Sequence, residues 1–334
     1  GIVDAHGDGF ERHLAPRRGA AADLNAGLVS LDRELAANGI TTAMLAQFWS
    51  WEGGMRGPDF ARALAEALRH ADIVGDMRVL LRVEIGCFAD FPDIERFVGR
   101  FDIGHVVLSD HLPHRALAAG TRVPRLEGQA LKAGRAPSEH QALLERLHRG
   151  LADAWTELPG LVSRLAHSGV RVGSHDDPDP DTRATFRAMG ATVAEFPTTL
   201  ATAKAAHGAG DVVVMGAPNV VRGGSHVRGG TAAAGMLADG LVTALASDYH
   251  YPALVGAVRR LVSEGWPLAK AWTLVSSGPA RALGFTDRGC IATGLRGDMV
   301  VADPGLTRIH GTFVAGRPVY ADAVLAERLI AAAA

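Results

Sequence analysis

The 334-residue sequence has little cysteine, little net charge and no long apolar run. Its two cysteines, Cys87 and Cys290, are too few for a disulfide framework, which favours a reducing cytoplasm. The formal net charge of −2 provides no basic surface for nucleic acid. No apolar stretch approaches the roughly 20 residues that a membrane-spanning helix needs. These absences predict a small-molecule substrate, with neither nucleic acid nor a membrane as partner.

We also expect no signal peptide, which agrees with a cytoplasmic location. Its first apolar run leads directly to His6. We therefore expect the natural protein to have a further N-terminal portion.

Regular alternation of strand-like and helix-like segments is what the sequence does contain. Hydrophobic residues make up 48% of the chain, enough for a large core. Short β-branched and apolar runs alternate with stretches whose apolar residues recur at helical spacing. Strands are expected at the start of the chain and at residues 39–48, 78–86, 105–111, 170–177, 191–199, 212–219 and 241–249. Helices are expected at residues 24–38, 58–75, 93–101, 138–167 with a break near Pro159, 181–189 and 254–263. A further helix is expected after the strand at 191–199 and ends at residue 206.

Eight strands alternating with helices predict parallel pairing and an α/β fold, a (β/α)₈ TIM-like barrel over residues 1–285. An open doubly wound sheet is the alternative. However, no Gly-x-Gly-x-x-Gly turn follows a strand as a dinucleotide-binding fold requires.

In such a barrel, functional side chains lie at the C-terminal ends of the strands. Seven of the eight expected strands end in a metal-ligand type or a polar amide. These residues are His6 with Asp8, Glu84, His111, His175, Glu195, Asn219 and Asp248. Imidazole and carboxylate groups together suit zinc or a similar divalent ion, so the pattern predicts a metallo-barrel.

Two of these strand ends carry the metal prediction. His6 and Asp8 are two residues apart, so on a strand both side chains point to the same face as a chelating pair. His175 ends a well-formed strand, and the turn DDPDPD follows it. We predict that all three residues bind the metal.

The other strand ends allow more than one role. Glu84 can bind metal or pair with Arg82 on the same face. His111 can bind metal or support another ligand, and Glu195 can instead orient the loop that follows it. Asp248 ends a clean apolar run and can bind metal or accept a proton as a general base.

Residues 112–137 interrupt the alternation with glycine, proline and basic residues. We expect this segment to cross one end of the fold. It is either a solvated insertion between helices or a lid over the substrate.

Basic residues and glycines gather near the same end of the predicted barrel. The stretch NVVRGGSHVRGG, residues 219–230, combines a glycine-rich backbone with arginines, which favours anion binding over a solvated loop. A multiply phosphorylated substrate would explain this grouping. The predicted phosphate-binding residues are Arg12, Arg17, Asn219, Arg222, Ser225, His226 and Arg228.

These motifs carry a resemblance to a known family. The strand ends and the closing segment, GLRGDMVVADP followed by TFVAGRPVY, resemble the amidohydrolase superfamily. In order along the chain, DAHGDGFERHLAPR, LSDHLPH, SHDDPDP, EFPTTLATAKAA, MGAPNVVRGGSH and ASDYHYPAL resemble the PhnM family of the carbon–phosphorus lyase pathway of phosphonate metabolism. The resemblance implies that residues 286–334 form a β-sandwich remnant and a terminal helix, without the usual N-terminal strands.

The resemblance also implies an activity and a metal. The activity is that of an α-D-ribose 1-methylphosphonate 5-triphosphate diphosphatase, which releases pyrophosphate and leaves the 5-phosphate. The implied metal ligands are His6, Asp8, Glu84, His175 and Asp248, with His111 and Glu195 as further candidates. The cofactor is a divalent ion, Zn²⁺ first and Mn²⁺ or Mg²⁺ as alternatives.

Two departures from the superfamily pattern leave the number of ions open. The first motif is His-x-Asp rather than His-x-His, and no strand ends in a lysine that could be carboxylated. Glu84 is a candidate to bridge two ions instead.

Two other functions stay open, as does a homodimer. One is hydrolysis of a C–N bond by a cyclic amidase, deacylase or deaminase. The other is a metal-free binding subunit.

Overall fold

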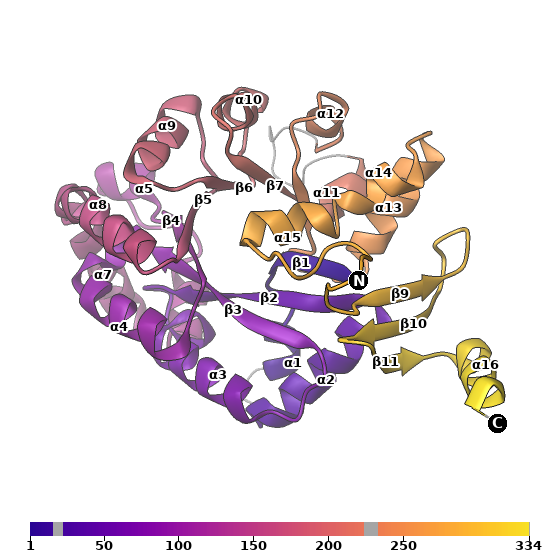
Figure 1. Cartoon of the computed structure of the whole chain (residues 1–334). Helices are drawn as coiled ribbons and strands as arrows, with labels where there is room; N and C mark the ends of the chain where they lie inside the picture. Colours follow the sequence, from indigo (N-terminus) through magenta and orange to yellow (C-terminus); the bar gives the residue numbers. More distant parts are fainter. Residues whose placement is uncertain (16–22, 224–232, 334) are drawn as a thin grey trace.

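Eight parallel strands follow one another around a nearly closed barrel in the computed structural model, which describes residues 1–15, 23–223 and 233–333 (Figure 1). Each strand pairs with the next along the chain, from β1 to β8. Parallel neighbours require a crossover between them, and helices supply it, as the alternation predicts. The strands are β1 (Ile2–Gly7), β2 (Ile40–Trp49), β3 (Asp76–Glu84), β4 (His105–Ser109), β5 (Arg171–His175), β6 (Val193–Glu195), β7 (Val212–Gly216) and β8 (Ala244–Ala246).

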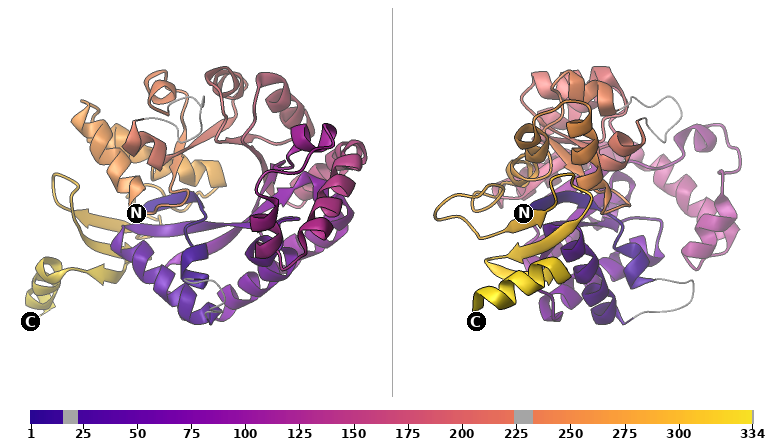
Figure 2. Two further views of the ribbon diagram at one scale, coloured as in Figure 1. Left: turned by 180° about the vertical axis from the view of Figure 1, so that it is seen from behind. Right: turned by 90° about the vertical axis from the view of Figure 1, so that its right-hand side faces the viewer.

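Helices surround these strands (Figures 1 and 2). Those before β5 are α1 (Glu11–Leu14), α2 (Leu24–Ala37), α3 (Pro58–His70), α4 (Phe91–Phe101), α5 (His114–Ala118), α6 (Leu126–Lys132), α7 (Pro137–Arg149) and α8 (Leu151–His167), with 3₁₀ turns η1 (Gly54–Arg56) and η2 (Ile85–Asp90). Those after β5 are α9 (Pro180–Met189), α10 (Leu200–Gly208), α11 (Ala217–Arg222), α12 (Ala233–Ala238), α13 (Ala253–Ser263), α14 (Leu268–Thr273) and α15 (Ser277–Leu283). None of these described helices is long and apolar enough to cross a membrane.

The helix α2 shows how the sequence pattern becomes core. Asp23 caps it by accepting a hydrogen bond from the Asn25 amide at 3.0 Å. The predicted stripe of Leu28, Leu31 and Leu35 is fully buried in the largest hydrophobic cluster. The same burial recurs around the barrel and holds the strand ends at fixed positions.

The barrel closes between β1 and the residues after β8. Gly7 forms a parallel bridge with Asp248. The Asp248 amide donates to the His6 carbonyl at 2.9 Å, and the Asp8 amide donates to the Asp248 carbonyl at 2.9 Å. This closure confirms the barrel and excludes the open doubly wound sheet.

One predicted helix break is wrong. The chain breaks at Gly150, between α7 and α8, while α8 continues through Pro159. A proline removes one helical hydrogen bond. Leu158, Leu161 and Leu165 are nevertheless buried on the same helix, and this packing keeps α8 intact.

The segment 112–137 crosses one end of the barrel, as expected. It contains α5 and α6, and its Leu117 and Leu126 pack in a small hydrophobic cluster with Trp51, which follows β2. Its Gln129 lines the cavity at the strand ends. This part of the segment therefore contributes to the lining of the cavity.

The C-terminal segment forms a separate antiparallel sheet in the order β11–β10–β9 (Figure 1). Its strands are β9 (Met299–Ala302), β10 (Ile309–Val314) and β11 (Arg317–Ala321), and α16 (Ala323–Ala333) follows them. The Thr312 hydroxyl donates to the Ala36 carbonyl at 2.6 Å, which fastens β10 to α2. The predicted closing hairpin is confirmed as β10 and β11.

Candidate metal centre

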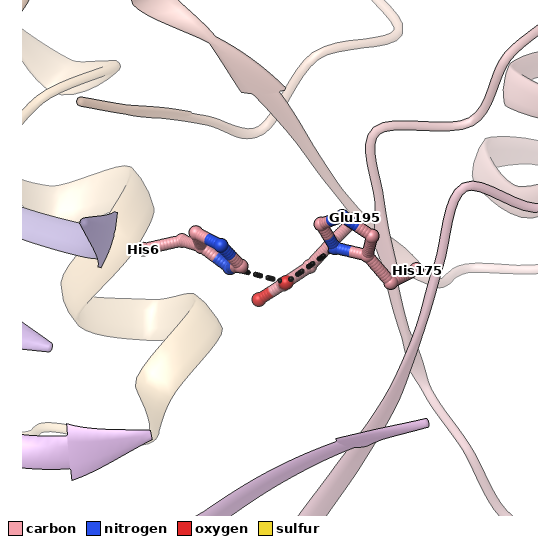
Figure 3. A group of neighbouring side chains, drawn as sticks. All are labelled: His6, His175 and Glu195. Carbon is pink, nitrogen blue, oxygen red and sulfur yellow. Dashed lines mark hydrogen bonds and ion pairs between the residues drawn. The ribbon is translucent and has the colours of Figure 1, made fainter. Parts of the chain in front are cut away.

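Three side chains from three strands converge inside the barrel (Figure 3). His6 comes from β1, His175 from the end of β5 and Glu195 from the end of β6. The His6 Nδ1 lies 2.7 Å from Glu195 Oε2, and the His175 Nδ1 lies 3.3 Å from the same oxygen. One nitrogen or oxygen from each residue lies within 4.8 Å of the others, so one ion could contact all three.

The protonation states of these side chains favour the binding of a cation. Burial raises the pKa of Glu195, but the nearby His6 and His175 rings outweigh it and hold the pKa below its usual value. Burial, together with the neighbouring Arg82, lowers the pKa of His175 to about 4. Glu195 is therefore a carboxylate and His175 a neutral imidazole at neutral pH, which are the forms that bind zinc.

His6 offers a direct test of whether a metal fits. Its ring is fully buried, and its Nε2 has no hydrogen-bond partner among the described residues. A buried polar nitrogen without a partner costs free energy, and a bound cation would remove that cost. Two imidazoles and a carboxylate also match the donor set that divalent zinc prefers. The residues therefore fit a divalent ion.

A second group lies beside the first and shares His175. Its other members are His111, which follows β4, and Asp176, which follows β5. The Asp176 Oδ2 lies 3.6 Å from His175 Nε2 and 3.7 Å from His111 Nε2. Burial opposes a charge on His111, but the Asp176 and Glu84 carboxylates outweigh it and raise its pKa to about 9.

Residues with positive φ stand where three of the strands end. They are Asp176 after β5 with φ of 60°, Phe196 after β6 with 53° and Asp248 after β8 with 55°. A side-chain-bearing residue rarely adopts this conformation, and such residues gather at functional sites. These turns end the strands earlier than the sequence predicted, and all three residues line the cavity at the strand ends.

Glu84 lies beneath the second group rather than in either one. The Ser109 hydroxyl donates to its Oε1 at 3.0 Å, and the His111 amide donates to its Oε2 at 2.9 Å. The His111 ring also bonds to Glu84. Burial raises the pKa of Glu84, and the His111 contacts outweigh it and lower the pKa. In this arrangement Glu84 orients His111 and forms no ion pair with Arg82 among the described contacts.

A cavity of about 430 Å³ opens beside these groups. Asp8, His111, His175 and Asp248 all line it, so the structure brings four predicted residues to one cavity. The predicted Asn219 lines it as well.

The structure gives two of the predicted phosphate-binding arginines other partners. Arg12 pairs with Glu34 and donates to the Tyr249 carbonyl at 3.0 Å, and it does not line the cavity. Arg222 donates to the Tyr249 hydroxyl at 3.3 Å, on the exposed surface. The remaining predicted phosphate ligands, Arg17, Ser225, His226 and Arg228, lie outside the described residues.

Comparison with known proteins decides the family. The α-D-ribose 1-methylphosphonate 5-triphosphate diphosphatase of Escherichia coli K12 is 32% identical to this chain over 321 residues. The match covers 93% of this chain and 84% of that protein. This chain belongs to the PhnM family. No family model matches the chain.

Solved structures show the same fold at low identity. The β-aspartyl dipeptidase of Fervidobacterium islandicum AW-1 is 15% identical with a TM-score of 0.58, over 97% of this chain and 84% of that one. The N-acetylglucosamine-6-phosphate deacetylase of Pasteurella multocida is 13% identical with a TM-score of 0.59, over 96% and 86%. This member of the PhnM family therefore shares its fold with these two enzymes.

The sequence prediction assigns no role of their own to two residues at this site. Asp176 directly follows His175 in the turn DDPDPD, and that position is its signal in the sequence. Arg82 is 5% exposed and lines the cavity, and its Nη2 lies 2.8 Å from His175 Nε2. The sequence indicates its position, because Arg82 comes two residues before Glu84 and both side chains therefore lie on the inner face of β3.

Proposed function

We propose that this chain is a metal-dependent diphosphatase of phosphonate catabolism. Its substrate would be α-D-ribose 1-methylphosphonate 5-triphosphate, and its products the 5-phosphate and pyrophosphate. The observation that supports this proposal most strongly is the 32% identity with the Escherichia coli diphosphatase over 93% of the chain. A cytoplasmic location belongs to this proposal, and a homodimer stays a prediction.

His6, His175 and Glu195 would hold a divalent ion, with Zn²⁺ preferred over Mn²⁺ or Mg²⁺ because two imidazoles contribute. Bound there, the ion would polarise a phosphoryl oxygen and lower the pKa of a neighbouring water. His111 and Asp176 provide a position for a second ion beside the first. Asp8 lines the same cavity and stays a candidate ligand, whereas Glu84 would act by orienting His111.

Asp248 is the proposed general base. Its backbone is fixed between His6 and Asp8 by the hydrogen bonds that close the barrel. Its side chain lines the cavity, so its carboxylate can accept a proton from a water held beside the metal ligands. The same carboxylate also stays a candidate metal ligand.

The phosphates would lie in the cavity against Arg82, Arg56 and Asn219. Arginine donates paired hydrogen bonds that match phosphate oxygens. Carboxylates outnumber arginines in the cavity lining, with Asp8, Glu52, Asp176 and Asp248 against the two arginines. A triphosphate therefore needs the charge of a bound metal in order to enter.

The test measures pyrophosphate release from the ribose triphosphate by the purified protein supplied with Zn²⁺, Mn²⁺ or Mg²⁺. Asp248→Asn should reduce kcat by about 10²- to 10⁴-fold, the usual contribution of a general base. Asp239→Asn is the matched control, because Asp239 is an exposed acid paired with Lys204 on the surface.

A panel of neutral amides tests the alternative C–N hydrolase under the same conditions. Metal-dependent amide cleavage without pyrophosphate release would refute the diphosphatase.

A further inference from the structure

Arg82 lies at the centre of the acidic groups of the site. Its guanidinium stacks over the Phe48 ring at 4.0 Å from the centroid. Asp8, Glu195 and Asp176 attract its charge, and its Nη2 contacts His175 Nε2 at 2.8 Å. A cation that is part of the protein thus stands against one of the candidate metal ligands.

The direction of this hydrogen bond is fixed by chemistry. A guanidinium can donate hydrogen bonds but has no lone pair with which to accept one. His175 Nε2 is therefore the acceptor, and the ring proton lies on Nδ1. That proton faces Glu195 Oε2 at 3.3 Å, so both sides of the ring are satisfied.

Metal coordination by His175 is incompatible with this bond through either nitrogen. An ion in the second group would take the Nε2 lone pair, which Arg82 occupies. An ion in the first group would take Nδ1 and move the ring proton to Nε2. That proton would then face the Arg82 N–H, and two donors facing each other repel.

We propose that Arg82 and a divalent ion compete for His175, and that metal binding releases the guanidinium to bind a phosphate group in the cavity. The competition rests on the metal centre alone, and the phosphate contact rests on the proposed function. A bound ion would neutralise the carboxylates that now attract Arg82. The cavity that Arg82 lines gives the released side chain a place beside the substrate.

Zinc affinity tests the competition. The protein is stripped with chelator, and its affinity for Zn²⁺ is measured against a chromophoric chelator. Arg82→Met keeps most of the side-chain volume and removes the hydrogen bond. Because a hydrogen bond to a charged group corresponds to roughly a tenfold step in a binding constant, Zn²⁺ should bind about tenfold more tightly.

Arg56→Met is the matched control. Arg56 lines the same cavity and carries the same charge, but its ion pairs are with Glu11 and Glu52. Arg56→Met should bind Zn²⁺ within about twofold of the affinity of the unmodified protein, since Arg56 blocks no ligand atom. Unchanged affinity in Arg82→Met, or an equal gain in both variants, would overturn the proposal, because equal gains reflect only the charge of the cavity.

A second variant guards against misfolding. Arg82→Lys keeps the buried charge and shortens the reach to His175, so zinc affinity should rise here too. Circular dichroism first establishes that each variant is folded. If only the lysine variant folds, an unchanged affinity in that variant overturns the competition.

Inorganic phosphate tests the release. At saturating Zn²⁺, calorimetry should show phosphate binding about tenfold weaker in Arg82→Met than in the unmodified protein. Equal phosphate affinity would overturn the second half of the proposal.

These outcomes are separable from the proposed function, because no measurement uses a triphosphate. Zinc competition without pyrophosphate release would refute only the diphosphatase. Pyrophosphate release with unchanged zinc affinity in Arg82→Met would refute only the competition.

Discussion

At the scale of single residues, His111 owes its charge to two carboxylates from different strands. Glu84 ends β3 and bonds to both the amide and the ring of His111, while Asp176 approaches the opposite nitrogen at 3.7 Å. These contacts raise the pKa of His111 to about 9 despite its burial. The ring is therefore a cation at neutral pH in this arrangement, and it would have to release a proton before it could bind the second ion.

Replacing Glu84 with glutamine should lower the pKa of His111. The amide keeps the shape of the side chain but loses the negative charge that favours the imidazolium. Titration of the His111 ring protons by nuclear magnetic resonance measures the shift in the stripped protein. Glu52→Gln is the control, because Glu52 lines the same cavity and pairs with Arg56. A pKa that stays at about 9 in the Glu84 variant would assign the effect to Asp176 alone.

At the scale of elements, the start of β3 fastens the C-terminal segment to the barrel. Asp76 accepts hydrogen bonds from Arg288 at 2.5 Å and from Arg296 at 2.9 Å, and it also pairs with Arg78. Burial opposes the charge of Asp76, but the hydrogen bonds from Arg78 and Arg288 outweigh it and lower its pKa to about 2. One carboxylate thus joins β3 to the segment that leads into β9.

Asp76→Asn should lower the free energy of unfolding by about 1–3 kcal/mol at neutral pH, because Arg78, Arg288 and Arg296 lose a charged partner. The folded-state pKa is below the unfolded value, so this stabilisation is complete above about pH 4 and is lost as the pH falls through about 2. Urea unfolding across this range measures the difference between the two proteins.

The difference in the free energy of unfolding between the unmodified protein and Asp76→Asn should shrink toward low pH. Asp59→Asn is the control, since Asp59 is a fully exposed acid paired with Arg62. A difference that is independent of pH would contradict an ionic role for Asp76.

At the scale of the whole molecule, barrel closure and the metal group depend on each other. The buried Asp4 carboxylate accepts from the Ser247 amide at 2.9 Å and from its hydroxyl at 2.5 Å, which ties β1 to the end of β8. Burial raises the pKa of Asp4 to about 6. The same strand β1 holds His6 against Glu195, which lies 189 positions later in the sequence. An ion bound there would connect β1 with β5 and β6.

Metal removal should therefore destabilise the whole fold. Because the unfolded chain does not hold these ligands together, a metal at about 100 times its Kd adds about 2.7 kcal/mol of stability. Thermal unfolding with chelator and with added Zn²⁺ measures the effect, and chelator should lower the Tm.

His6→Ala should abolish the zinc-dependent part of the shift. His70→Ala should preserve it, since His70 is an exposed residue on α3. An identical Tm with and without metal in the unmodified protein would contradict a metal centre that joins these strands.

The sequence by itself determined the barrel and its functional end. Periodicity distinguishes strand from helix, and eight alternating units leave parallel closure as the economical solution. Residues such as His6, His175 and Asp248 could be selected because a parallel barrel places its strand ends on one face. The length of α8 could not be predicted, because the packing around Pro159 outweighs the local cost of proline.

Only the tertiary structure decided which groups meet. Glu195 lies against His6 because the barrel closes, whereas Glu84 turns to His111 and Arg82 to His175. Arg12 remains a predicted phosphate-binding residue, and the structure places its guanidinium against Glu34 of α2. The physical reason is that strand position fixes the face on which a side chain emerges. Its partner is then set by contacts between distant parts of the chain, which local sequence does not encode.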